Sequence, residues 1–288
     1  MHKVTDRQGN IQEENSIQDR LLEQLYQHAA GRILLRPLIS PVFSRLGGCF
    51  LDSSISRFLI SPFIRANAID MSDYEQTEYR SYNDFFKRKI RPEARCIQTT
   101  PEVFVSPCDS RLSVYPIDGR SDFYIKHTHY TAESLLKNRK LAEKYAGGYI
   151  WIFRLCVDDY HRYIYVDGGK TSRNIRIPGI YHTVNPVAND RYPIYKENTR
   201  EYCLLRSENF GTVLQMEVGA MLVGKIENRP GQRMVQRGEE KGNFAFGGST
   251  IILMTQRGRV IPDPDILEYS ARGIETKVKL GERVGCKK

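Results

Sequence analysis

The stretch "AFGGSTIILM", residues 245–254, carries two glycines and a Ser-Thr pair directly before an apolar run. Residues 251–254 are typical of a buried strand, because short aliphatic runs that follow glycine favour strands. Turns usually end in glycine, whereas here Gly247 and Gly248 lead straight to a nucleophile, Ser249. The stretch therefore predicts a buried strand with a candidate reactive site at its start.

A serine hydroxyl can attack the carbonyl of the preceding residue where the peptide between them can be distorted. Gly248 favours that attack, because glycine tolerates strained dihedrals and crowds its neighbours least. The resulting ester could break the chain by β-elimination, and hydrolysis would leave a pyruvoyl group, an electron sink comparable in role to pyridoxal phosphate. The alternative is a Gly-Gly turn into a strand, followed by an ordinary serine.

The sequence around this stretch predicts an α+β fold, with an N-terminal helical region at 1–90 and a mostly antiparallel β domain at 91–288. In the first region, Ser16 and Asp19 form a capping box, and residues 17, 21 and 25 share one helical face. One further helix is expected at 131–145, with Thr131 as its N-cap. Short β-branched and aromatic runs separated by turn residues occupy 104–117, 148–157, 161–169, 202–226, 244–261 and 274–285.

Length and composition indicate a globular protein: 288 residues and 40% hydrophobic content suit one large domain, or one domain with an appendage. The first 16 residues lack the apolar centre of a signal peptide, and no run approaches the roughly 18 apolar residues of a membrane-spanning helix. Six cysteines without a CxxC pair argue against zinc and for reduced thiols in the cytosol.

The net charge of +9 predicts an anionic partner. Residues 24–66 contain five arginines and a single acid, Asp52, interleaved with bulky apolar side chains. That pattern suits a surface that lies on an anionic bilayer. The alternative is a helical appendage whose arginines are solvated, and nucleic acid is disfavoured because the basic residues elsewhere form no concentrated stripe.

Six segments, taken together and in this order, resemble the phosphatidylserine decarboxylase family. They are "SYNDFFKRKIRPEAR" (81–95), "SPCDSRLSVY" (106–115), "DDYHRYIYVDGG" (158–169), "HTVNPVA" (182–188), "VGAMLVGKIEN" (218–228) and "GEEKGNFAFGGST" (238–250). The length and the "FGGST" form are most similar to the bacterial type II branch.

The resemblance implies a chain that cuts itself between Gly248 and Ser249. A β chain (1–248) and an α chain (249–288) would stay together, with a pyruvoyl group made from Ser249 at the start of the α chain, and a dimer of such pairs is expected. The substrate would be phosphatidylserine, converted to phosphatidylethanolamine and CO2 by an enzyme peripheral on the cytoplasmic face of the cell membrane. No metal is implied, and the cysteines and histidines show no ligand spacing.

The resemblance also implies an Asp-His-Ser site. Asp109 matches the acidic member and His161, in "DYHR", matches a histidine of the same site, which could take the serine proton and later shuttle protons. Taken alone, Asp109 could be a turn carboxylate and His161 a structural histidine, and Asp158 and Asp159 are interpreted as loop acids.

One position departs from the family pattern. Many members carry a second histidine three residues after the first, often assigned the base role in self-cleavage, and Ile164 stands there in this chain. Either His161 acts as the base, or another histidine reaches the site. His182, in "IYHTVNP", is the candidate, since its loop resembles one that lines the family's site.

The hypothesis for catalysis is that the amine of a serine headgroup forms a Schiff base with the pyruvoyl carbonyl, loses CO2 and is reprotonated by His161 or His182. Two rivals remain. One is a pyruvoyl-dependent decarboxylase of a soluble amino acid, and the other is a catalytically silent membrane-binding scaffold of the same fold, in which the chain stays intact.

Overall fold

The structure of the protein is a computed structural model. It describes residues 2–14, 25–26, 33, 39–75, 78–125, 128–184, 188, 192–220, 225–245 and 249–288. The expected capping box of Ser16 and Asp19 lies outside these residues, as do Gly247 and Gly248.

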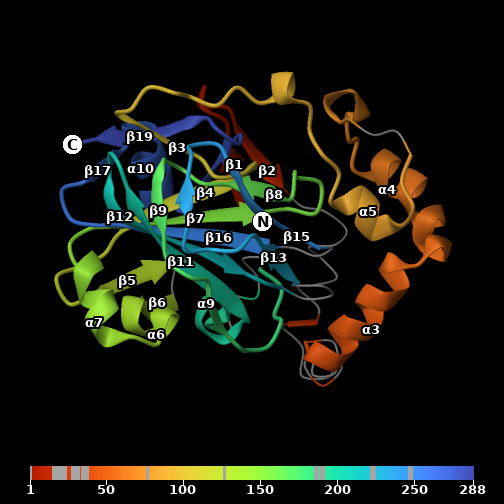
Figure 1. The fold of residues 1–288 in the computed structure, drawn as a ribbon, viewed down its shortest axis with the longest axis horizontal. Helices are drawn as coiled ribbons and strands as arrows, with labels where there is room; N and C mark the ends of the chain where they lie inside the picture. Colours follow the sequence, from red (N-terminus) through yellow and green to blue (C-terminus); the bar gives the residue numbers. More distant parts are fainter. Residues whose placement is uncertain are drawn as a thin grey trace.

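One large sheet forms the centre of the molecule (Figure 1). Its strands are β1 (His2–Thr5), β2 (Ile11–Glu14), β4 (Ser110–Pro116), β7 (Tyr149–Leu155), β9 (Gly169–Thr171), β10 (Ile175–Ile177), β11 (Arg200–Ser207), β12 (Gly211–Val218), β14 (Met234–Val235), β16 (Ser249–Thr255) and β18 (Glu275–Val278). Within the described ranges they pair in the order β14-β9-β11-β12-β16-β7-β4-β18-β1-β2, and β10 pairs with β11. The pairing is antiparallel except between β1 and β18.

Smaller sheets pack around the large one. Their strands are β3 (Val103–Val105), β5 (Asp122–Ile125), β6 (Thr128–Thr131), β8 (Arg162–Ile164), β13 (Ile226–Asn228), β15 (Glu240–Phe244), β17 (Val260–Pro262) and β19 (Arg283–Lys287). They form the sheets β13-β15-β8 and β17-β19-β3 and the hairpin β5-β6.

The helices lie mainly at the periphery of the β domain. They are α3 (Pro41–Asp52), α4 (Ile60–Ala66), α5 (Tyr82–Phe86), α6 (Ala132–Leu136), α7 (Arg139–Ala142), α9 (Ile194–Glu197) and α10 (Pro264–Ala271), with short 3-10 turns η1 (Ser54–Leu59), η2 (Met71–Asp73), η3 (Pro92–Ala94) and η4 (Glu143–Tyr145). Helices α3, α4 and α5 gather at one side of the molecule (Figure 1).

The predicted class, a helical N-terminal region followed by a mostly antiparallel β domain, is confirmed. The structure adds that the chain begins as the hairpin β1-β2, whose first strand joins the large sheet beside β18. The N-terminal region is therefore helical only after this hairpin.

The helix predicted at 131–145 is divided into two. Thr131 caps its start as expected, in a reciprocal capping box with Ser134. Lys137 then adopts a left-handed conformation with φ of 52°, which ends α6, and Asn138 caps the start of α7. The helical periodicity of the sequence continues through Lys137 and Asn138, so the pattern did not predict this break.

Strand β16 separates two apolar cores, because its side chains alternate between the faces of the large sheet. The helix-side core includes Leu135, Leu136, Ile152, Ile194, Tyr195, Ile252 and Met254. The sheet-side core includes Phe153, Leu155, Tyr163, Phe244, Ile251 and Leu253. The small sheet β13-β15-β8 therefore covers the face of β16 that carries its odd-numbered residues.

The helical side of the molecule packs on the segment that leads into β16. Leu51 of α3 and Phe85 and Phe86 of α5 form an apolar cluster with Ala245. This contact brings the N-terminal helices next to the stretch that precedes Ser249.

Candidate active site

Ser249 is the first residue of β16 and is buried, with 1% of its surface exposed. Its hydroxyl oxygen has no hydrogen-bond partner among the described residues. Leaving a buried polar group unpaired costs about 1–3 kcal/mol, so such a group calls for an explanation. An unpaired, desolvated hydroxyl is suited to act as a nucleophile.

The register of β16 fixes the direction of the Ser249 side chain. Ser249 lies directly opposite Leu155 of β7, and directly opposite residues share a face of the sheet. Since Leu155 and Ile251 both belong to the sheet-side core, Ser249 faces the small sheet that contains β8. Thr250 faces the helix-side core instead.

His161 lies immediately before β8 and is also buried, with 1% exposure. Its backbone carbonyl accepts a hydrogen bond from Phe244, which extends the pairing of β8 with β15 by one residue. Alternation then places His161 on the same face as Tyr163, toward the large sheet. His161 and Ser249 therefore lie on facing surfaces of the same interior space.

The two ring nitrogens of His161 are in different environments. Nδ1 lies 2.9 Å from the carbonyl oxygen of Asp159, and because a carbonyl can only accept, Nδ1 carries the proton. Nε2 is buried and has no partner among the described residues, so the neutral ring presents a bare lone pair there. Burial lowers the pKa of His161 to about 3, which keeps the ring neutral near pH 7.

The ring of His182 packs against Tyr26 and Tyr192 of the helix-side core. Its Nδ1 is 3.2 Å from the hydroxyl of Tyr26, a member of the helix-side core, and its Nε2 is 3.4 Å from the carboxylate of Glu197. The ring stacks on Tyr192, with 4.6 Å between ring centroids. Burial lowers its pKa to about 4. Both nitrogens of His182 thus have partners.

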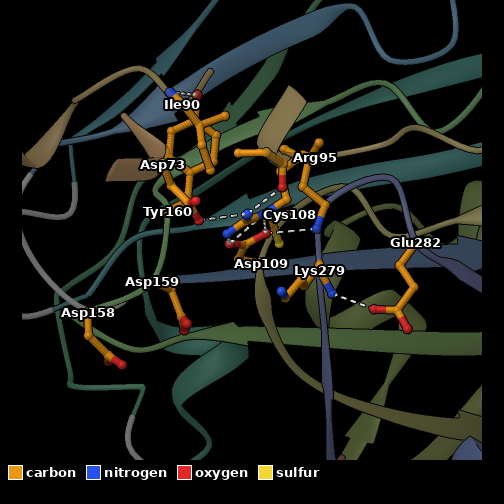
Figure 2. Close-up of polar contacts among 12 residues, drawn as sticks. Asp73, Ile90, Arg95, Cys108, Asp109, Asp158, Asp159, Tyr160, Lys279 and Glu282 are labelled. Carbon is orange, nitrogen blue, oxygen red and sulfur yellow. Dashed lines mark hydrogen bonds and ion pairs between the residues drawn. The ribbon is translucent and has the colours of Figure 1, made fainter. Parts of the chain in front are cut away.

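Asp109 contacts neither Ser249 nor His161 through a hydrogen bond in the described part of the chain. Its carboxylate is held by Arg95, whose Nη2 lies 2.6 Å from Oδ2, and it accepts a hydrogen bond of 2.8 Å from the backbone nitrogen of Leu280. Figure 2 shows Asp109 turned toward Arg95 and Lys279, with Asp158 and Asp159 lying apart from it. The hydrogen bonds of the Asp109 carboxylate are thus made with Arg95 and with the backbone of Leu280.

Ile164 lies on the Asp109 side of β8. Its side chain packs with Tyr74, Tyr160 and Leu280, and Leu280 is the residue whose backbone binds Asp109. Residue 164 alternates with His161, so it faces away from the large sheet. A side chain at this position is directed toward the surroundings of Asp109 rather than toward Ser249.

The two adjacent acids before His161 differ in environment. The side chain of Asp158 is 38% exposed, as expected for a loop acid, whereas that of Asp159 is 15% exposed and accepts a 2.6 Å hydrogen bond from Nη1 of Arg111. Burial raises the pKa of Asp159 to about 7. The interpretation of Asp159 as a loop acid missed this contact, because no sequence pattern indicates that Arg111 pairs with it.

The donor atoms of Cys156, Asp158 and Asp159 lie within 4.8 Å of one another. Two guanidinium groups already form hydrogen bonds with atoms of this group. Arg111 binds Asp159, and Nη1 of Arg154 lies 3.0 Å from the Cys156 sulfur. Arginine side chains thus contact two of the three members of this group, Cys156 and Asp159.

Comparison with known proteins connects this geometry to one family. The family model described as phosphatidylserine decarboxylase matches residues 82–286. The chain is 46% identical over 265 residues to phosphatidylserine decarboxylase proenzyme 2 of Clostridium acetobutylicum, covering 92% of this chain and 91% of the relative. It is 42% identical over 273 residues to the phosphatidylserine decarboxylase proenzyme of Ruminiclostridium cellulolyticum, with 92% and 91% covered. It is 39% identical to that of Clostridium novyi over the whole of both chains.

Proposed function

The chain belongs to the phosphatidylserine decarboxylase family of pyruvoyl-dependent lyases, and from this premise we propose that it converts phosphatidylserine to phosphatidylethanolamine and CO2 with a pyruvoyl group made from its own Ser249. The observation that carries the proposal is the buried Ser249 hydroxyl at the start of β16, which has no hydrogen-bond partner among the described residues. Its burial and its freedom from hydrogen bonds fit a residue that attacks its own chain. The pyruvoyl group then supplies the electron-accepting carbonyl that decarboxylation requires.

His161 is the base in this proposal. Its bare, buried Nε2 can accept the Ser249 proton, and its low pKa keeps that nitrogen unprotonated near neutral pH. In the decarboxylation that follows, the same nitrogen can carry the proton that is returned to carbon. His182 is less suited to either step, because both of its nitrogens have partners.

Asp109 has a supporting role in the proposal. Its contacts with Arg95 and with the backbone of Leu280 tie the start of β4 to the segment after β18. These contacts favour an anchor for the surroundings of Ile164 over a direct partner of the histidine.

Members of this family are membrane-associated, and we propose that α3 and η1 form the docking surface of this protein. Their exposed apolar side chains, with exposures from 38% to 70%, are Val42, Phe43, Leu46, Phe50, Ile55 and Phe58. The exposed Arg57 and Arg65 add positive charge for an anionic bilayer. Across the ranges described, no helix has the length and apolar character needed to cross a bilayer.

The docking surface favours a lipid substrate over a soluble amino acid. Helix α3 packs through Leu51 on the cluster that includes Phe86, and Phe86 contacts the His161 ring with 4.1 Å between centroids. A lipid held at this surface would have its headgroup on the side of the molecule where His161 lies. We propose the cytoplasmic face of the cell membrane as the place where this occurs.

The experiment that tests the proposal is intact-mass spectrometry of the purified protein beside Ser249→Ala, His161→Ala and His182→Ala. We expect two chains, 1–248 and 249–288, from the parent protein and from His182→Ala, with a pyruvoyl group at the start of the shorter chain. Ser249→Ala and His161→Ala should remain a single chain.

An uncut parent protein after long incubation would refute self-processing and favour the silent scaffold. The processed protein is then assayed for CO2 release from phosphatidylserine vesicles and from soluble amino acids. Release from the soluble substrates alone would refute the lipid substrate while leaving the pyruvoyl chemistry in place.

A further inference from the structure

The turn formed by residues 156–159 links β7, the strand that pairs with β16 at Ser249, to His161. It begins directly after Leu155, which lies opposite Ser249, and it ends two residues before His161. The position of the His161 ring relative to Ser249 therefore depends on the conformation of this short turn.

Asp159 closes the turn from both its backbone and its side chain. Its backbone nitrogen donates to the carbonyl of Cys156 at 3.0 Å, and its Oδ2 accepts from the backbone nitrogen of Cys156 at 2.7 Å. The carbonyl of the same residue faces Nδ1 of His161 at 2.9 Å. One residue thus sets the turn and also sets which nitrogen of the ring holds the proton.

Two arginines hold Asp159 from different elements. Arg111, on β4, binds the carboxylate at 2.6 Å. Arg88, just after α5, donates from Nη2 toward the carbonyls of Asp158 and Asp159 at 3.2 and 3.5 Å.

Arg88 is unusual because it is buried, with 1% exposure, and forms no ion pair with a carboxylate in the described ranges. The rings of Tyr74 and Phe85 lie 4.5 and 4.8 Å from its guanidinium carbon. Aromatic faces and carbonyl oxygens attract a cation without neutralising it. Its positive charge therefore persists near His161, where it disfavours a protonated ring.

We infer that Asp159 is the positioning residue of the base, clamped by Arg88 and Arg111, and that it performs the orienting task that Asp109 does not. This inference rests on the proposed function. Asp159 acts through its carbonyl, which keeps the proton on Nδ1 and leaves Nε2 bare toward the sheet that carries Ser249. The reverse tautomer would place a hydrogen on Nε2 and block it as a base.

The proton balance of self-cleavage requires this tautomer. The Ser249 oxygen bonds to the carbonyl carbon of Gly248 as its proton passes to Nε2. The bond from that carbon to the Ser249 nitrogen then breaks, and the nitrogen takes the proton from Nε2. Nδ1 keeps its own proton throughout, so the Asp159 carbonyl stays its acceptor at every stage.

The test compares Asp159→Ala and Asp159→Asn with the neighbouring control Asp158→Asn, in the full chain. Self-cleavage of freshly synthesised protein is followed by intact mass. We expect Asp158→Asn to cut at the parent rate, because the Asp158 carboxylate lies 3.8 Å from Arg111, beyond hydrogen-bond distance, and is 38% exposed. Asp159→Ala should be slower by about 100-fold, the size of effect expected when a catalytic group is misplaced by about 1 Å. The self-cleavage rate of Asp159→Asn should lie between those of the parent and Asp159→Ala, since the asparagine side-chain oxygen can still accept a hydrogen bond from the backbone nitrogen of Cys156.

A second measurement separates positioning from general loss of stability. In uncut precursors that carry Ser249→Ala, nitrogen-15 NMR of the histidine rings reports which nitrogen of His161 is protonated. We expect the Nδ1-protonated form to dominate with Asp158→Asn and to lose its dominance with Asp159→Ala. Cutting at the parent rate by Asp159→Ala, or an unchanged ring tautomer in that variant, would overturn the inference. If the parent protein is itself uncut, the proposed function fails first, so the two failures are distinguishable.

Discussion

At the scale of single residues, the two buried histidines predict how the precursor responds to acid. Burial lowers the pKa of His161 to about 3 and that of His182 to about 4, against an ordinary value of 6.5. At pH values between these lowered pKa values and 6.5, the histidines of the unfolded chain bind protons that those of the folded chain do not. The free energy of unfolding should therefore fall as the pH drops from about 6.5 toward 4.

We expect His161→Gln and His182→Gln, each in the uncut Ser249→Ala precursor, to lose less stability than their parent between pH 7 and pH 5. Urea unfolding at the two pH values measures this difference. An equal loss in parent and variants would show that neither ring is buried in its neutral form.

The individual residues of the candidate site were predictable from sequence to different degrees. Ser249 and His161 stand in short motifs, so their selection needed no knowledge of the fold. His182 was a reasonable alternative by motif, yet both of its ring nitrogens have partners, Tyr26 and Glu197. Asp159 was missed because its carboxylate pairs with Arg111, on a strand that joins β7 only after folding.

At the scale of secondary-structure elements, the break between α6 and α7 predicts a stabilising substitution. Lys137 adopts φ of 52°, a conformation that costs side chains with a β-carbon about 1 kcal/mol or more. Lys137→Gly should raise the free energy of unfolding by about 0.5–1 kcal/mol, after the entropy of glycine in the unfolded chain is subtracted.

Lys140→Gly, within α7, is the matched control and should lower stability by about 1 kcal/mol. Both are measured by urea unfolding of the uncut precursor. A loss of stability with Lys137→Gly equal to that of the control would contradict the strain argued for Lys137.

Alternation and turn residues predicted most strands of the β domain, because these signals are local. The hairpin β1-β2 was missed because its strands have four residues each and depend on β18, near the other end of the chain. The division of the predicted helix was missed for a related reason, since Lys137 and Asn138 do not interrupt the helical pattern by residue type.

At the scale of the whole molecule, the apolar face of α3 and η1 predicts binding to lipid vesicles. Phe58 is 63% exposed, and burying such a side chain contributes about 1.5–3 kcal/mol. Phe58→Asp should therefore weaken binding to phosphatidylserine-containing vesicles by about tenfold or more, as measured by vesicle flotation.

Met234→Asp is the matched control, because Met234 is 64% exposed but lies on β14, outside the docking surface. It should leave vesicle binding unchanged, and self-cleavage should be unaffected in both variants. Equal weakening by the two substitutions would locate membrane binding elsewhere on the molecule. Binding through Arg57 and Arg65 should also weaken as salt concentration rises.

The central place of β16 has a consequence for the lifetime of the enzyme. The segment 249–288 supplies β16 between β12 and β7, and β18 between β4 and β1, so the two products of the proposed cleavage would be interleaved in one sheet. The precursor folds in a first-order process, whereas the separated products would have to find each other in a second-order one. Refolding of the cut protein should then depend on concentration, and dilution should trap its parts apart. If the chain is cut as proposed, a molecule that unfolds afterwards should therefore recover more slowly than the uncut precursor.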